Sequence, residues 1–283
     1  MADVIEASRI ADAVREAIPR AAFGLRADAL AALNDAAARE RSPRGRAALA
    51  QLVENAAIAE RDSVPLCQDT GTVWVRVELG SEEALTGDLA VAVDAAVAES
   101  YTASGLRMSL VADALVDRTN TGDNTPAFVD VAFRPGRGAT VHVMLKGGGS
   151  DNASRVEMLA PGEGFAGVER VVLETVREKA TGACPPLVVG VGVGATFDKV
   201  GALAKRALLR GIGHGHPDPR VAELEARLLA EVNATGIGPG GLGGDTTALA
   251  VHVATAPCHI AALPVAVNLG CCAVRSVTVE LAP

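Results

Sequence analysis

Apolar residues occupy every second position from Val73 to Leu79, and polar or amphipathic residues lie between them. A period of two is typical of a β-strand with one buried face. Further short apolar runs, bounded by turn residues, predict strands at residues 128–133, 140–145, 187–193, 248–254 and 263–267. All of the predicted strands therefore lie in residues 62–283.

Other segments carry apolar residues at spacings of three and four, which predicts α-helices. These segments are residues 27–40, 45–61, 81–104, 164–180, 198–210 and 217–233. Residues 1–61 form a helical N-terminal part without a catalytic constellation, which we interpret as a platform or an oligomer surface. No fixed-period repeat or low-complexity linker divides the chain. We therefore predict one domain over residues 1–283, of mixed α/β (α+β) class, in which residues 62–283 carry the functional site.

Composition narrows the kind of core and the kind of partner. Of the 283 residues, 49% are hydrophobic but only 2% are aromatic, so small side chains must fill the core. The 30 glycines predict several functional loops. The formal net charge of −8 argues against binding to nucleic acid or to an anionic membrane, although local basic residues could still bind an anionic substrate.

Cysteine usage and the N-terminal sequence lead us to expect a cytoplasmic protein. The five cysteines are an odd number at irregular spacing, and the N-terminus does not resemble a signal peptide. We therefore expect thiols or metal ligands rather than disulfides. Residues 246–274 contain no Lys, Arg, Asp or Glu, but their prolines, histidines and cysteines favour two buried strands with a loop between them over a membrane helix.

One stretch combines a cysteine with several polar side chains immediately before a strand: Pro65-Leu66-Cys67-Gln68-Asp69-Thr70-Gly71. We interpret Cys67 as the first anchor of a metal cluster. Cys184 and Cys271 also lie in turns at strand ends, and no Cys-x-x-Cys pair is present. Distant thiolates that meet at loop ends would enclose a cluster inside the domain, whereas the alternative is that these cysteines are buried structural thiols.

Glycine-rich and polar loops supply further candidates. After a predicted strand, Lys146 is followed by Gly147-Gly148-Gly149, which is either an anion-binding nest of backbone N–H groups or a tight turn. Neither a Walker A loop nor a dinucleotide-binding fingerprint is present. Residues 236–244 must let the backbone approach a neighbour closely. His214 and His216 could bind a metal or lie in a solvated loop.

Several long motifs together resemble the class I, iron–sulfur fumarate hydratases and the related L-tartrate dehydratases. The motifs are the stretch at residues 65–71, Asn-Thr-Gly-Asp-Asn-Thr-Pro-Ala at 120–127, Lys-Gly-Gly-Gly-Ser-Asp-Asn at 146–152, Ala-Cys-Pro-Pro at 183–186, the glycine loop at 236–244 and Leu-Pro-Val-Ala-Val-Asn-x-x-Cys at 263–271. They follow the family's order. The resemblance is to the alpha subunit, or to the N-terminal catalytic domain of single-chain members.

The resemblance implies a [4Fe–4S] cluster held by Cys67, Cys184 and Cys271, with one iron left without a protein ligand. That iron would act as a Lewis acid on the hydroxyl and a carboxylate of a 2-hydroxy diacid, with no net redox change. The Asn-x-x-Cys spacing favours Cys271 over the adjacent Cys272 as the third ligand, and Cys258 is a spare thiol.

The resemblance also implies roles for residues beyond the ligands. Arg107 would clamp a substrate carboxylate, and the backbone of Gly149 would donate N–H groups to the same anion. Gln68 would orient the substrate, and Asp69 would orient it or transfer a proton. His259 matches a histidine of the family's active site, so Asp69 and His259 are the predicted catalytic residues; Lys146 is a further candidate for substrate binding. Each of these residues could instead have a structural role.

The chain ends at Pro283, where single-chain members continue into a second domain. We therefore expect a separate beta subunit, in a heterotetramer or a homodimer of alpha–beta pairs. The expected reaction is the reversible hydration of fumarate to malate, and the alternatives are an L-tartrate dehydratase, which forms oxaloacetate, or a mesaconate hydratase. An alternative of another class is a non-enzymatic module that binds metal or anions.

Overall fold

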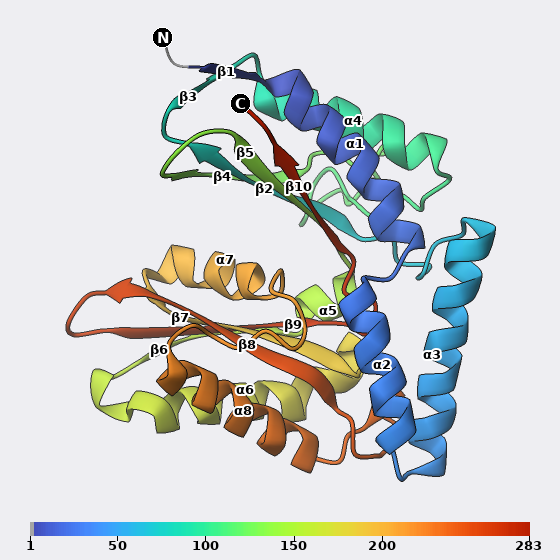
Figure 1. The fold of residues 1–283 in the computed structure, drawn as a ribbon, viewed down its shortest axis with the longest axis vertical. Helices are drawn as coiled ribbons and strands as arrows, with labels where there is room; N and C mark the ends of the chain where they lie inside the picture. The colour runs from blue at the N-terminus through green and yellow to red at the C-terminus, as the bar shows by residue number, and fades with distance from the viewer. Residues whose placement is uncertain (1–2) are drawn as a thin grey trace. The chain divides into compact units, whose positions relative to one another are not determined.

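The computed structural model describes residues 3–283, and its contacts divide the chain into two compact units (Figure 1). Unit 1 comprises Met1–Arg26, Ile58–Gly148 and Arg275–Pro283, and unit 2 comprises Ala27–Ala57 and Gly149–Val274. Each unit has its own four-stranded sheet. The chain passes between the units several times, so neither unit is one continuous stretch of sequence.

The sheet of unit 1 has the order β10-β5-β2-β4. These strands are β2 (Thr72–Gly80), β4 (Phe128–Arg134), β5 (Ala139–Lys146) and β10 (Ser276–Leu281). Strand β2 pairs with β4 in parallel and with β5 antiparallel, so β4 and β5 lie on either side of β2 and do not pair with each other. Two short strands, β1 (Asp3–Glu6) and β3 (Glu83–Thr86), form a separate parallel pair.

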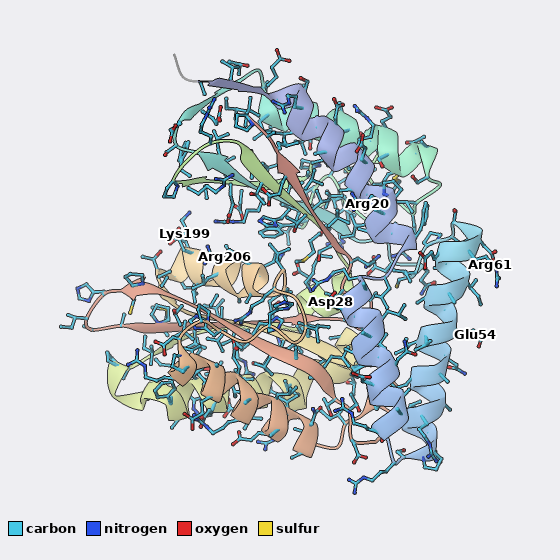
Figure 2. The ribbon with its side chains drawn as sticks, in the orientation of Figure 1. Arg20, Asp28, Glu54, Arg61, Lys199 and Arg206 are labelled. Carbon is cyan, nitrogen blue, oxygen red and sulfur yellow. The ribbon has the colours of Figure 1, made fainter. Side chains whose placement is uncertain are left out.

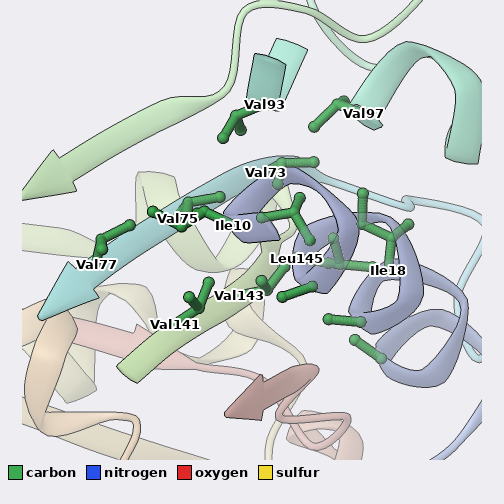
Figure 3. Close-up of a cluster of buried hydrophobic side chains, with 14 of the residues drawn as sticks. Ile10, Ile18, Val73, Val75, Val77, Val93, Val97, Val141, Val143 and Leu145 are labelled. Carbon is green, nitrogen blue, oxygen red and sulfur yellow. The ribbon is translucent and has the colours of Figure 1, made fainter. Parts of the chain in front are cut away.

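Helices α1 (Ala7–Phe23) and α4 (Leu89–Ala103) cover one face of this sheet and enclose the core of unit 1 (Figure 3). The core consists mainly of valines, alanines, leucines and isoleucines, as the low aromatic content requires. Tyr101, the single tyrosine of the chain, is fully buried, and its hydroxyl donates to the carbonyls of Thr70 and Gly71 at 3.1 and 3.0 Å. Burial raises the pKa of Tyr101, so the hydroxyl remains a donor at neutral pH.

The sheet of unit 2 has the order β6-β9-β7-β8. Its strands are β6 (Ser154–Leu159), β7 (Leu187–Ala195), β8 (Ala248–Cys258) and β9 (Leu263–Gly270). Helices α6 (Gly164–Lys179) and α8 (Pro219–Ala234) lie on one face, and α7 (Phe197–Ala207) lies on the other (Figure 1). Gly190 and Gly192 of β7 permit the close approach of α7, because a Cβ on Gly190 would lie 2.3 Å from the carbonyl oxygen of Ala204.

The remaining helices are α2 (Ala27–Arg39), α3 (Pro43–Asp62) and α5 (Gly148–Asn152), with short 3₁₀ turns η1 (Pro161–Glu163), η2 (Ala180–Ala183) and η3 (Pro239–Gly241). Helix α2 belongs to unit 2. Asp28 on α2 accepts a hydrogen bond from the backbone N–H of Ile212 at 2.7 Å, which fastens the helix to that unit (Figure 2).

The predicted α/β class with a helical N-terminal part is confirmed, and so are the six predicted strands. The uncharged residues 246–274 form the predicted two strands, and no helix among residues 3–283 is long and apolar enough to cross a membrane. The expectation of a single domain with parts 1–61 and 62–283 stays a prediction.

Other local predictions were wrong. Residues 81–104 do not form one helix: β3 comes first, and α4 begins only after Asp88, whose carboxylate accepts the backbone N–H of Val91 at 3.1 Å. Asp88 is therefore the N-cap of this helix. Strands β1, β6 and β10 were not expected.

Candidate active site

The carboxylate of Asp69 is held by backbone donors in the irregular segment that precedes β2. Its Oδ1 accepts the N–H of Gly71 at 3.1 Å, and its Oδ2 accepts the N–H of Gly148 at 2.8 Å. Gly148 belongs to the glycine run that follows Lys146. At least one N–H group of the predicted anion nest is therefore satisfied by the protein's own carboxylate.

Arg107 and Ser109 bring further polar atoms to the same carboxylate. The guanidinium of Arg107 lies 3.4 Å from Oδ1 of Asp69, and the hydroxyl of Ser109 lies 3.5 Å from it. The Arg107 side chain is 56% exposed, which leaves it able to bind an anion as well. The structure thus brings Asp69 together with Arg107, Ser109 and Gly148.

Asn124, in the long polar loop, holds the segments that carry Ser109 and Gly71 together. It is fully buried, accepts the N–H of Ser109 at 2.7 Å and donates to the carbonyl of Gly71 at 3.1 Å. It connects three segments of unit 1 that are distant in sequence. Our reasoning from the sequence did not single it out, although it lies within the motif at residues 120–127.

Arg275 is a second residue that the sequence reasoning missed. It is 4% exposed, and its Nη1 donates to the backbone carbonyl of Asp69 at 2.6 Å, while its buried Nε has no hydrogen-bond partner. A buried guanidinium with an unused donor is costly and therefore calls for a functional or positional reason. The sequence feature that could have identified Arg275 is its position as the first charged residue after the uncharged stretch 246–274.

Lys146 and Gly149 occupy tightly packed positions, each within its own unit. Lys146 ends β5 and is 3% exposed. Gly71 has φ +83°, and a Cβ there would lie 2.7 Å from the carbonyl of Lys146, so only glycine fits at this crossing. Gly149, in unit 2, is packed equally tightly, since a Cβ on it would lie 2.5 Å from the carbonyl oxygen of Gly182.

Two of the predicted cluster ligands lie on adjacent loops of unit 2. Cys184 precedes β7, and Cys271 follows β9; because these strands are antiparallel, with Val188 opposite Gly270, both loops emerge at the same end of the sheet. The backbone N–H of Cys272 donates to the carbonyl of Cys184 at 3.2 Å. None of the five cysteines forms a disulfide.

Cys67 belongs to unit 1, where it is a half-buried thiol two residues before Asp69, and the neighbouring Gln68 is exposed. Within residues 3–283, no three His, Cys, Asp or Glu side chains form a group that could hold a metal ion. Cysteine thiols on adjacent loops are nevertheless the donor type that iron–sulfur clusters require. The residues of unit 2 fit such a group with two ligands, Cys184 and either Cys271 or Cys272.

His259 lies away from the cysteine loops. It follows β8 in the turn to β9, whereas Cys271 follows the opposite end of β9, eight residues long. The structure therefore does not bring His259 together with Cys184 and Cys271 within unit 2. The ring of His259 accepts the N–H of Ala261 at 3.1 Å, and Cys258 beside it donates to the carbonyl of Ala262.

The other histidine candidates also have local roles. Nδ1 of His216 accepts the backbone N–H of Asp218 at 3.0 Å, and the backbone N–H of His216 donates to Glu225 at 2.9 Å. These contacts organise the turn before α8. His214 is exposed, so the description as a solvated turn fits this segment well.

The glycine loop at residues 236–244 supports the Cys184 loop. The N–H of Gly240 donates to the carbonyl of Pro185 at 2.8 Å. At the far end of the loop, the carboxylate of Glu40, which is 2% exposed, accepts the N–H groups of Asp245 and Thr246 at 2.9–3.0 Å and that of Ser42 at 3.0 Å. Burial alone would raise the pKa of Glu40, but these N–H donors outweigh it, and the pKa lies below its ordinary value.

Comparison with known proteins agrees with these features. Residues 11–280 match the family model described as fumarate hydratase (fumerase). The chain is 38% identical over 273 residues to a protein of Methanocaldococcus jannaschii named "Putative L(+)-tartrate dehydratase subunit alpha", covering 94% of this chain and 95% of that one. It is 39% identical over 216 residues to the L(+)-tartrate dehydratase subunit alpha of Escherichia coli O157:H7, covering 75% and 70% of the two chains. The chain therefore belongs to the fumarate hydratase (fumerase) family and is a hydro-lyase enzyme.

Proposed function

We propose that this chain is the alpha subunit of an iron–sulfur hydro-lyase that catalyses the reversible hydration of fumarate to malate. The observation that carries the proposal is the Asp69 constellation. A carboxylate anchored by a backbone N–H group lies 3.4 Å from a half-exposed arginine, two residues after a free thiol. Such a group provides a proton-transferring side chain beside an anion-binding one.

The ligands of the [4Fe–4S] cluster in this proposal are Cys67, Cys184 and Cys271. When bound through these three thiolates, the cluster would supply a Lewis acid for the leaving hydroxyl. The contact between the backbones of Cys272 and Cys184 supports two of these ligands, because it holds their loops together.

The protein's own residues bind the substrate and move the proton. Arg107 binds a carboxylate of the dicarboxylate through its exposed guanidinium, and Gln68, which is also exposed, donates hydrogen bonds to the substrate. Asp69 holds or accepts the proton at its carboxylate. Lys146 and the backbone of Gly149 are further candidates for binding the same anion, whereas His259, at the other end of the unit 2 sheet from Cys271, is given no part in this proton transfer.

A second candidate substrate is L-tartrate, because the relatives named above are tartrate dehydratase alpha subunits. Tartrate differs from malate by one hydroxyl, so the same chemistry would produce oxaloacetate. The word "alpha" in those names also supports a separate beta subunit for this chain, in alpha–beta pairs. Mesaconate remains the third substrate to test.

The test is anaerobic co-expression with the beta subunit, followed by assays with fumarate, malate, L-tartrate and mesaconate. We expect water addition to fumarate to have the highest kcat/KM, and Asp69→Asn to lower kcat by about 100-fold or more. Higher kcat/KM with L-tartrate would identify the second candidate. Absence of turnover with all four compounds, in a complex that contains iron, would refute the proposed reaction.

Iron and acid-labile sulfide should be measured per chain in the same preparations. We expect about four of each in the wild type, a loss in Cys271→Ser, and retention in the matched control Cys272→Ser. The opposite pattern for the two serine variants would assign Cys272 as the ligand, and no iron in any preparation would remove the cluster from the proposal.

A further inference from the structure

Strand β4 exposes large apolar side chains at the edge of the unit 1 sheet. It ends the strand order, so among residues 3–283 no strand pairs with its outer edge. Phe133 is 74% exposed, Phe128 53% and Val131 47%. The chain has only five phenylalanines, and two of them lie exposed on this one strand. An edge of this kind is a template for pairing with another strand.

The usual protections of an edge strand are weak in β4. It is seven residues long and contains no proline, lysine or glycine. Its register with β2 runs from Trp74 opposite Phe128 to Gly80 opposite Arg134 without a bulge. A regular and apolar edge strand is suited to extension by a further strand.

The sequence of β4 is complementary to itself in one antiparallel register. If Ala132 lies opposite Ala132 of a second copy, Asp130 lies opposite Arg134 on one face of the sheet. On the other face, Val131 lies opposite Phe133. Both pairs occur twice because the arrangement has twofold symmetry, and opposite charges and apolar pairs across strands are favourable.

Neighbouring registers lack this complementarity. Centring the pair on Val131 places Asp130 opposite Ala132 and Arg134 opposite Phe128, so both charges lose a partner. The carboxylate of Asp130 is also ordered in advance, since it accepts the indole N–H of Trp74 at 3.1 Å. An ordered side chain loses less entropy when the second copy binds.

We propose that two copies of this chain associate through β4, which pairs antiparallel with β4 of the second copy about a twofold axis at Ala132. The two unit 1 sheets then form one continuous sheet. This interface rests on the proposed assembly of alpha–beta pairs and specifies how two of them would associate. Its test measures the mass of the complex and the pairing register of β4, not enzyme activity. The interface and the proposed reaction can therefore fail separately.

Charge exchange tests the register. The mass of the full chain, alone and with its beta subunit, should be measured by sedimentation velocity across a range of concentrations. We expect a dimer of this chain in the wild type. Asp130→Arg and Arg134→Asp should each raise the dimer Kd by about tenfold, because each creates two like-charge pairs. The double variant should restore wild-type dimerisation.

Arg44→Asp, an equal charge change on exposed α3, is the matched control and should leave the dimer intact. Melting temperatures of the variants establish that they fold. A monomeric wild type, single variants that dimerise normally, or a double variant that does not recover would each overturn the proposal.

Cross-linking tests the axis directly. Opposed Cα atoms in an antiparallel pair lie about 4.5–5.5 Å apart, which is within disulfide reach. Ala132→Cys should therefore form an intermolecular disulfide under mild oxidation, whereas Val129→Cys, offset from the axis, should not. Equal cross-linking of both variants would contradict the register.

Discussion

Four donors of unit 1 converge on Asp69, and three of them are distant from it in sequence. The four donors are the N–H groups of Gly71 and Gly148, the hydroxyl of Ser109 and the guanidinium of Arg275, and Arg107 adds a longer ionic contact. Such a network holds both the backbone and the carboxylate of the residue in place. Within a site that must transfer a proton, this placement determines the geometry of the transfer.

At this scale we predict that Arg275 is a positioning residue. Arg275→Met removes the hydrogen bond to the Asp69 carbonyl, and the displaced carboxylate should lower kcat by about 100-fold with little change in KM. Steady-state kinetics of the complex with the beta subunit measure both parameters.

The control for Arg275 is Arg76→Met, which removes a mostly buried arginine of the same unit that pairs with Glu78 on β2 rather than with Asp69. Its kcat should stay near that of the wild type. If both variants lose kcat equally, or if Arg275→Met changes only KM, Arg275 does not position Asp69.

At the scale of elements, the glycine positions on β7 set the distance between the unit 2 sheet and α7. Gly190 and Gly192 face the carbonyls of Ala204 and Val200, at distances that leave no room for a side chain. The same strand begins just after Cys184. Tight packing of β7 therefore also determines where the Cys184 loop begins.

Gly190→Ala should destabilise the chain, because its Cβ would lie 2.3 Å from a backbone oxygen that cannot rotate away. We expect a loss of about 2–3 kcal/mol in the free energy of unfolding. Urea denaturation of the apo chain provides the measurement.

Gly201→Ala is the matched control on the facing helix α7, since no atom lies within 4 Å of a Cβ there. It should be neutral or stabilising by up to about 1 kcal/mol, because alanine favours a helix more than glycine. Equal losses in the two variants would mean that close packing is not the cause.

A second prediction at the element scale concerns Glu40, which ties the glycine loop to the segment between α2 and α3. Its folded pKa lies below the ordinary 4.5, so its stabilising contribution is present above about pH 4.5 and is lost as the pH falls through the folded value. Glu40→Gln should cost about 2 kcal/mol at pH 7.

The difference in unfolding free energy between wild type and Glu40→Gln should narrow as the pH falls below 4.5, since the protonated glutamic acid resembles glutamine. Unfolding of the apo chains at several pH values measures this difference. The thiol of Cys184 should also react faster in the variant, because the loop that contacts Pro185 loosens. A difference that is constant with pH would exclude ionisation of Glu40 as the cause.

At the scale of the whole molecule, the chain interleaves two units along its sequence. The cysteines divide between them, with Cys67 in unit 1 and the other four in unit 2. Arg275 follows unit 2 directly in sequence and belongs to unit 1. Each compact unit therefore contains residues that lie far apart in the sequence, such as Asp69 and Arg275 in unit 1.

Local pattern determined much of the fold. Alternation from Val73 to Leu79 predicted β2, and helical spacing predicted α2, α3, α6, α7 and α8, because side-chain periodicity reports directly which face is buried. Periodicity did not identify the short elements. Strand β3 has four residues and interrupts a segment predicted as one helix, and β10, with six residues, was not predicted. Periodicity also does not predict which strands pair: β4 and β5 are consecutive in sequence, yet each pairs with β2.

By itself, the sequence determined the elements with strong periodicity, the family through its ordered motifs, and the thiols and polar residues available for chemistry. Only the tertiary structure decided that Arg275 contacts Asp69, 206 residues away, that Cys184 and Cys272 share a hydrogen bond, and that His259 lies at the other end of its sheet from Cys271. The physical reason is that periodicity records burial along one element, whereas these contacts depend on strand order and on loop paths, which many distant residues set together.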